Sequence, residues 1–189
     1  MRSICIYIFV VCLATSVFSQ TIPYVNYTSE DGLPSSSIYS VYQDEIGYIW
    51  LATDYGVSRF NGYEFDNFHA ESISNTITSF SEDTAGILYF TTDQKETFYF
   101  FNDSIHKIDG NPKFKRIQTN VAISNPEIKS ILHAKTVTDI IVDYENSTWV
   151  TTLEHGLFYF PYLPEVTNLS QNTIINDIKQ SNNRILKLE

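Results

Sequence analysis

The stretch that decides the fold is residues 38–60, which read IYSVYQDEIGYIWLATDYGVSRF. Short apolar and aromatic runs alternate here with turn residues: Asp44 and Gly47 mark one turn, and Gly56 marks the next. Aspartate hydrogen-bonds the backbone of a tight turn, and glycine adopts a positive φ without steric cost. The pattern predicts short strands separated by tight turns. The expected strands are 38–42, 48–53 and 57–60, with a fourth over 63–68 after the Asn61-Gly62 hairpin signal.

The same pattern recurs further along the chain. Residues 77–92 read ITSFSEDTAGILYFTT, and residues 137–152 read VTDIIVDYENSTWVTT, followed by GLFYF at 156–160. A degenerate fourth copy starts at Ile175 and runs to Glu189. The copies therefore begin near residues 38, 77, 137 and 175. The recurring positions, which we expect to be structural, are Asp44, Gly47, Trp50, Thr53, Gly56, Asp83, Gly86, Tyr89, Thr92, Asp143, Trp149, Thr152 and Gly156.

Four antiparallel strands in about 40 residues, repeated along the chain, are typical of β-propeller blades. Apolar spacings of three and four residues, which a helical repeat requires, are absent from the pattern. We therefore predict an all-β chain of about three to four four-stranded blades. Because the fourth copy ends inside its second expected strand, we predict an incomplete propeller and a truncated product of a longer gene.

The amino-acid composition argues against one functional class, the nucleic-acid-binding proteins. The 189 residues carry 22 acidic and 12 basic side chains, a formal charge of −10, and 15% are aromatic. A nucleic-acid-binding protein needs a basic face for phosphates, so nucleic acid is not an expected partner. Strands rich in Tyr and Phe suit a packed β core.

The first 20 residues differ from the rest of the chain. Arg2 precedes an uncharged, largely apolar run at residues 3–18, a pattern typical of a secretory signal peptide. The alternative, an uncleaved membrane anchor, usually needs about 20 apolar residues. Cys5 and Cys12 both lie in this segment, so the repeats over 21–189 contain no disulfide and no thiolate metal site. We predict an exported product.

Residues 32–60 also carry a family resemblance. Gly32-Leu-Pro34 followed by Asp44-x-x-Gly47-x-Ile-Trp50 and Thr53-x-x-Gly56 closely resembles the two-component regulator propeller repeat. That resemblance implies the periplasmic sensor region of a bacterial sensor or hybrid histidine kinase, of which this chain is an N-terminal fragment. Remaining blades or a dimer partner would belong to the longer protein.

The later copies depart from the family pattern. Lys95 and Asn146 stand where copies two and three should have a turn glycine, and one extra residue precedes Gly156. In the fourth copy the Asp, Gly and Trp positions hold Ser181, Arg184 and Lys187.

Connectivity suggests one ligand-binding face. In a propeller, the turns between second and third strands open on the face where the chain enters the next blade, so equivalent turns form a ring. Acidic, amide and aromatic side chains in these turns suit an oligosaccharide or another small polar ligand, although Asp is common in ordinary turns. The candidate residues are Asp54, Tyr55, Asp93, Gln94, Glu154 and His155.

Catalysis is not predicted, and no cofactor is expected. The four histidines have no zinc-like spacing, and no nucleophile elbow is present. Glu64 and Asp66 could pair for glycoside hydrolysis, but alternation on an outer strand favours solvent-facing charges. Three functions stay open: a sensing module, a secreted propeller scaffold or binding protein, and a propeller lyase or glycosidase.

Overall fold

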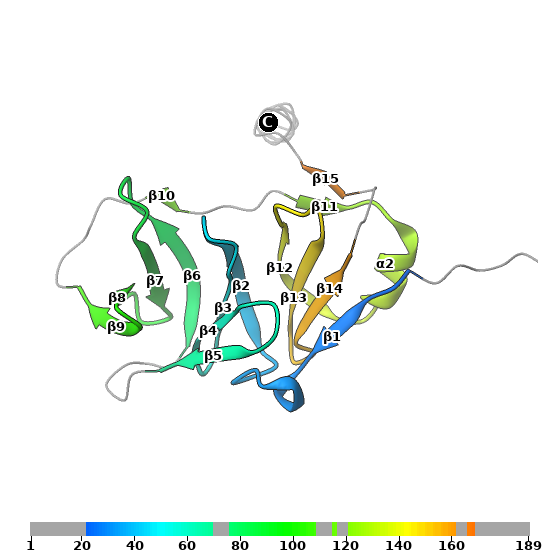
Figure 1. Ribbon diagram of the computed structural model, residues 1–189. Coiled ribbons are helices and arrows are strands. Elements are labelled where there is room, and N and C mark those ends of the chain that lie inside the picture. The colour runs from blue at the N-terminus through cyan, green and yellow to red at the C-terminus, as the bar shows by residue number, and fades with distance from the viewer. Residues whose placement is uncertain (1–21, 70–75, 109–114, 117–120, 162–165, 169–189) are drawn as a thin grey trace, which may run out of the picture.

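The computed structural model describes residues 22–69, 76–108, 115–116, 121–161 and 166–168. The chain folds into antiparallel sheets arranged side by side (Figure 1). This confirms the predicted all-β class with four-stranded, propeller-type sheets. The predicted signal peptide and the degenerate fourth copy lie outside the described residues. No helix within the described ranges is long and apolar enough to cross a membrane.

Three sheets correspond to the three clear copies, and we call them blades I, II and III. Blade I has the strand order β2-β3-β4-β5, and blade II has the order β6-β7-β8-β9 with the short β10 added beside β6. Blade III has the order β12-β13-β14-β1. The bounds are β1 (Val25–Tyr27), β2 (Ile38–Gln43), β3 (Ile49–Thr53), β4 (Gly56–Phe60), β5 (Phe65–Phe68), β6 (Ile77–Glu82), β7 (Leu88–Thr92), β8 (Thr97–Phe101), β9 (Ser104–Lys107), β10 (Lys115–Arg116), β12 (Thr136–Val142), β13 (Thr148–Leu153) and β14 (Leu157–Phe160).

The turn between first and second strands is built the same way in all three blades. The Asp44 carboxylate accepts backbone N–H groups of its own turn and the indole N–H of Trp50 at 2.8 Å. Asp143 accepts the indole N–H of Trp149 at 2.7 Å in the same manner. In blade II the hydroxyl of Tyr89 donates instead, at 3.0 Å from Asp83. The recurring Asp and aromatic positions are thus partners in one structural unit.

The residues that replace turn glycines adopt the backbone conformation that glycine favours. Lys95 has φ of 67° and Asn146 has φ of 63°, both in the left-handed region. Glu154, the extra residue of copy three, has φ of 71°. The tertiary structure keeps each turn although the side chain makes that conformation costlier than it is for glycine.

Blade III does not use a fourth strand from its own copy. Its outer position is filled by β1, which pairs with β14 so that Tyr27 lies opposite Leu157. Blade I places Phe68 of β5 opposite Val57 in the equivalent position. Blade III is therefore four-stranded, but its fourth strand comes from outside copy three. The segment after copy three instead forms β15 (Val166–Asn168), which pairs with β11 (Val121–Ile123).

Two glycines show that β1 occupies the position that β5 has in blade I. A Cβ on Gly56 would lie 2.4 Å from the carbonyl oxygen of Phe68. A Cβ on Gly156 would lie 2.1 Å from the carbonyl oxygen of Tyr27. In both blades the outer strand passes directly over this glycine, and both glycines have positive φ.

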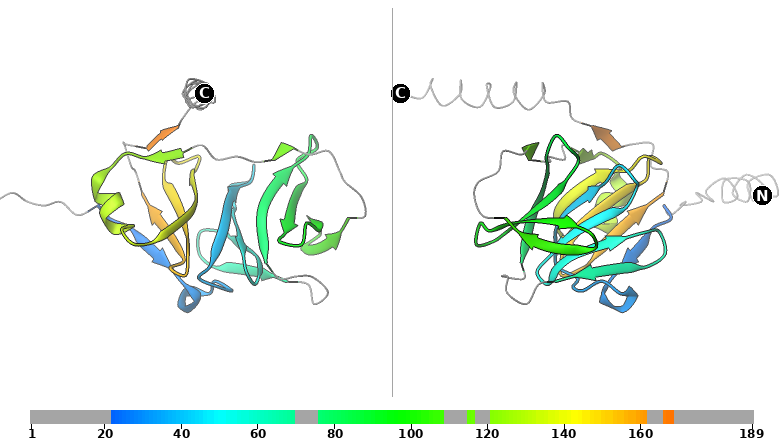
Figure 2. Two further views of the ribbon diagram at one scale, coloured as in Figure 1. Left: turned by 180° about the vertical axis from the view of Figure 1, so that it is seen from behind. Right: turned by 60° about the vertical axis from the view of Figure 1, so that its left-hand side comes forward.

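The blades lie in the order III–I–II (Figures 1 and 2). Trp149 of blade III packs in a core shared with Leu51 and Phe60 of blade I. Trp50, on the other face of blade I, packs in a core shared with Phe80 and Phe90 of blade II. Each tryptophan therefore faces the next blade. The hydroxyl of Ser40 and the amide of Val41 in β2 also donate to Asp139 of β12, which ties blade III to blade I.

A short helix covers the outer face of blade III. Helix α2 (Pro126–Ile131) begins at Asn125, whose side chain accepts the amide N–H of Glu127 at 2.8 Å. Ile128 is fully buried against Phe158 and Phe160 in a third core. This helix lies in the long gap between copies two and three, and the sequence pattern did not predict it.

Candidate functional site

The six candidate residues from the sequence lie at one end of the blades, and all of them are exposed. The turns of blades I and III are neighbours there, because the amide of Asp54 donates to Ser37 and that of Gly156 donates to Ser36. The Tyr55 ring lies 5.9 Å from the His69 ring. The amide of Asp93 donates to Thr76 at the entry to blade II, so each turn contacts a segment that enters a blade.

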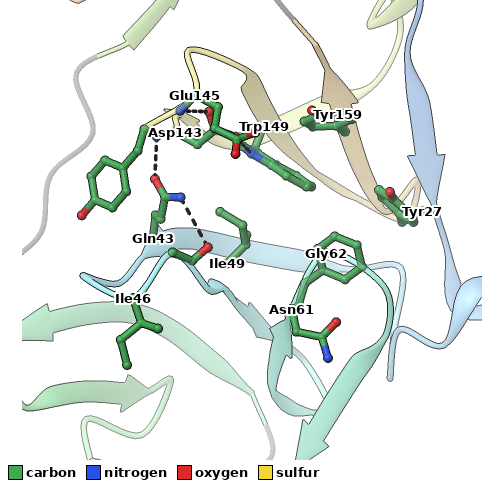
Figure 3. A pocket seen from close by; sticks show the side chains of 13 residues that line it. Tyr27, Gln43, Ile46, Ile49, Asn61, Gly62, Asp143, Glu145, Trp149 and Tyr159 are labelled. Carbon is green, nitrogen blue, oxygen red and sulfur yellow. Dashed lines mark hydrogen bonds between the residues drawn. The ribbon is translucent and has the colours of Figure 1, made fainter.

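A pocket lies at the opposite end, between the first-to-second turns of blades I and III (Figure 3). Its volume is about 520 Å³. Blade I contributes the turn at Ile46 and Gly47 and the hairpin at Asn61 and Gly62. Blade III contributes the turn from Asp143 to Glu145 and the rings behind it. This pocket is within the usual range for small-ligand sites, which are concave and largely apolar with a few polar groups.

Gln43 joins the two turns that border the pocket. Its side-chain oxygen accepts the amide N–H of Tyr144 at 2.9 Å, and its side-chain nitrogen donates to the carbonyl of Gly47 at 3.4 Å (Figure 3). One amide side chain thereby connects the blade III turn to the blade I turn. The distance between the two sides of the pocket is therefore constrained by hydrogen bonds.

Aromatic rings form the inner wall. The Trp149 ring centroid lies 4.4 Å from that of Tyr159 and 6.4 Å from that of Tyr27. Phe60 of blade I meets Trp149 edge-on at 5.9 Å. Burial, followed by the proximity of Tyr159 and Asp31, raises the pKa of Tyr27 above its ordinary value. The Tyr27 hydroxyl therefore stays protonated and neutral at physiological pH.

The rim carries an exposed ring and acidic charge. Tyr144 is 68% exposed and Ile46 is 82% exposed. Asp143 and Glu145 are the charged residues of the lining, and no described Lys, Arg or His side chain lines the pocket. Across the described parts of the chain, no group of three or more His, Cys, Asp or Glu side chains is placed to hold a metal ion. The arrangement suits a small ligand with a flat or apolar face and hydrogen-bonding groups.

Sequence reasoning missed this site because its wall comes from distant segments. Tyr27 precedes the first copy, and Gln43 and Tyr144 are about 100 residues apart. The local signals at the pocket were the Asn61-Gly62 hairpin and the recurring Gly47, Asp143 and Trp149, which the pattern marked as structural. The six candidate residues at the other end of the blades remain a predicted ligand face.

A comparison with known families identifies the first copy. The two component regulator propeller family matches residues 32–55. This stretch is a two-component regulator propeller repeat. It spans β2, β3 and the Asp44 turn between them, which borders the pocket, and it ends in the turn that follows β3. The resemblance predicted from the motif is therefore confirmed for this segment. A comparison with curated proteins gave no match.

Solved structures with a similar chain path include larger proteins. One is the extracellular domain of a protein named as a hybrid two component system from B. thetaiotaomicron, with 18% identity, a TM-score of 0.41 and coverage of 80% of this chain and 21% of that chain. Another is virginiamycin B lyase from Staphylococcus aureus, with 12% identity, a TM-score of 0.35 and coverage of 74% and 43%. This chain thus spans about a fifth of the first protein and less than half of the second.

Proposed function

We propose that the chain is an extracytoplasmic ligand-binding propeller segment of a two-component sensor, exported to the periplasm. The two-component regulator propeller repeat at residues 32–55 carries the sensor part of this proposal. The pocket between blades I and III carries the binding part. In a longer protein the segment would act with further blades, a membrane span and a kinase.

The position of the pocket supports a sensing role. It lies between two blades, and its rim turns are joined through Gln43. A ligand that contacts both turns changes the free energy of their relative placement. A sensor requires such a difference in ligand affinity between two states. The proposal includes no catalytic step, and the ligand is a small polar molecule, of which sugars and other polyols are one class.

Thermal unfolding of the exported chain tests the binding part. A panel of neutral oligosaccharides, polyols, amines and carboxylates is screened for a saturable rise in Tm, because a ligand that binds only the folded state stabilises it by mass action. We expect at least one class to raise Tm, and Tyr144→Ala to remove that rise. Tyr63→Ala is the matched control, because Tyr63 is 96% exposed in the neighbouring hairpin and does not line the pocket.

The result also separates the alternatives. If no compound class raises Tm in a Tyr144-dependent way, the binding role is overturned. A scaffold role, favoured by the exposed side chains of Ile46, Tyr63 and Tyr144 at one end of the blades, would then take its place. Turnover of a bound sugar or lactone would instead indicate a lyase or glycosidase.

A further inference from the structure

The interface between blades I and II contains an internal cation held by aromatic rings. The guanidinium carbon of Arg59 lies 4.8 Å from the Tyr48 ring centroid and 5.4 to 5.6 Å from those of Trp50, Phe68 and Phe100. A cation within about 6 Å of a ring centroid is attracted by the ring quadrupole. Asp66 also pairs with Arg59 at 2.9 Å.

The interface between blades III and I repeats these positions. In β-pairing, Arg59 lies opposite Trp50, and Tyr159 lies opposite Trp149. Tyr159 of blade III therefore has the place that Arg59 has in blade I.

Two further rings around Arg59 also have counterparts around Tyr159. Phe68 and Tyr27 are the outer-strand residues over the two matched glycines. The facing blade supplies Phe100 in one interface and Phe60 in the other, and each meets the tryptophan edge-on, at 4.8 Å and 5.9 Å. Three of the four rings around Arg59 thus have counterparts around Tyr159, whereas the position of Tyr48 holds Ser147 in blade III.

The two interfaces differ at the position of the cation. In blade III that position holds an uncharged tyrosine, and the pocket of about 520 Å³ opens beside the same set of rings. Its lining adds the Tyr144 ring and the carboxylates of Asp143 and Glu145, with no described basic side chain. The turn amides and Trp149 use the Asp143 carboxylate, whereas Glu145 is exposed at the rim.

We infer that this pocket binds a small organic cation, a molecule with a guanidinium or alkylammonium group. The cation would lie against the Trp149 and Tyr27 rings, with Glu145 supplying the opposite charge. This inference narrows the ligand class of the proposed function and rests on it. Neutral isosteres lose the attraction to the rings, and anions are repelled by the acidic rim.

Fluorescence titration tests the inference directly. The chain has two tryptophans, so in a Trp50→Phe background the emission comes from Trp149 in the pocket wall. The probes are methylguanidinium and tetramethylammonium, with methylurea as the uncharged isostere and acetate as the anion, all at one ionic strength. We expect saturable changes with the cations and about tenfold weaker binding of methylurea and acetate. Calorimetry on the unsubstituted chain checks that Trp50→Phe does not create the effect.

The most decisive variant places a competing cation from the chain itself beside the pocket. Tyr159→Arg should supply the guanidinium from the chain itself and weaken binding of the cation probes at least about tenfold. Gln94→Arg is the matched control, because it adds the same charge on an exposed turn at the other end of the blades. Glu145→Gln, a change at the exposed rim, should weaken binding of the cations several-fold and leave binding of methylurea unchanged. This variant is the replacement test if Tyr159→Arg does not fold.

Three results would overturn the inference. The first is methylurea or acetate binding as tightly as the cations, and the second is equal binding of the cations by Tyr159→Arg and Gln94→Arg. A neutral sugar that binds in a Tyr144-dependent way while the cations do not would overturn the inference and leave the proposed function standing. Failure of every class in the thermal screen would instead overturn the proposed function.

Discussion

The two blade interfaces use the same repeat positions and differ in what fills them. Between blades I and II, the Arg59 guanidinium lies among four rings. Between blades III and I, Tyr159 replaces it and a pocket remains beside the rings. This position of the repeat therefore holds a cation in one interface and a tyrosine beside a pocket in the other. The recurrence of the motif conceals this difference because position 59 is not among the recurring residues.

The outer strands of blades I and III also differ, in where along the chain they come from. Blade I is completed by β5, which follows β4 through a tight hairpin, whereas blade III is completed by β1 from the start of the repeats. Paired residues in β1 and β14 are at least 130 positions apart. Closing such a long loop costs more conformational entropy than closing a hairpin. Blade III therefore depends on a distant segment, and blade I does not.

The largest effects are expected at the two glycines beneath the outer strands. Gly156→Ala and Gly56→Ala each place a Cβ against a carbonyl oxygen at positive φ, and each should cost about 2–4 kcal/mol in urea unfolding. Hydrogen exchange separates the two: Gly156→Ala should expose the amides of residues 25–27, and Gly56→Ala those of residues 65–68. Loss of protection at both strands in either variant would contradict independent closure. Gly47→Ala, with no atom within 4 Å of the new Cβ, is the control for positive φ alone.

Removal of the Arg59 guanidinium should have the next largest effect on stability. Arg59→Ala deletes the contacts with four rings and the ion pair with Asp66, and we expect a loss of about 2–3 kcal/mol in the free energy of unfolding. Tyr159→Phe at the matched position removes the hydroxyl contact with Ser147 at 3.1 Å and should cost about 1 kcal/mol. Equal losses by urea unfolding would mean that the Arg59 cation contributes nothing special to its interface.

Smaller gains are expected at the left-handed turns that lack glycine. Lys95→Gly in blade II should stabilise the chain by about 1 kcal/mol, because φ of 67° is strained for lysine. Asn146→Gly in blade III should gain only a few tenths, since asparagine tolerates this conformation. Thermal unfolding of the two variants gives the comparison. A larger gain at Asn146 would show that blade III carries strain beyond its turn.

Alkaline pH should weaken both interfaces, with no effect at neutral pH. Burial raises the pKa of Tyr27 at the III–I interface and that of Tyr42 at the I–II interface, where a hydrogen bond to Glu82 adds to the effect. A raised pKa in the folded state gives stability that is fully present below the ordinary tyrosine pKa of about 10 and is lost as pH rises through the folded pKa.

Urea unfolding between pH 8 and pH 11 checks this dependence. Tyr27→Phe and Tyr42→Phe should each flatten the fall in stability above about pH 10. Tyr63→Phe, at a fully solvated ring, is the control. An unchanged slope in both interface variants would exclude these tyrosines as its source.

The sequence by itself determined the local architecture. Aspartate and glycine in the turns, with apolar and aromatic residues between them, predicted the strands of blade I within one or two residues at each boundary. This worked because a tight turn and its hairpin form from residues close in the chain. The Asp44–Trp50 and Asp143–Trp149 bonds follow from the same spacing of six residues.

The tertiary structure alone decided how the blades join and where the pocket lies. The β1–β14 pairing, the helix over blade III and the Gln43–Tyr144 contact connect segments far apart in the chain. Local pattern cannot encode them, because the free energy of each depends on which surfaces meet after the blades have formed. A single exchange, arginine for tyrosine at matched positions, takes its meaning only from the rings that the folded chain gathers around it, one of them from the facing blade.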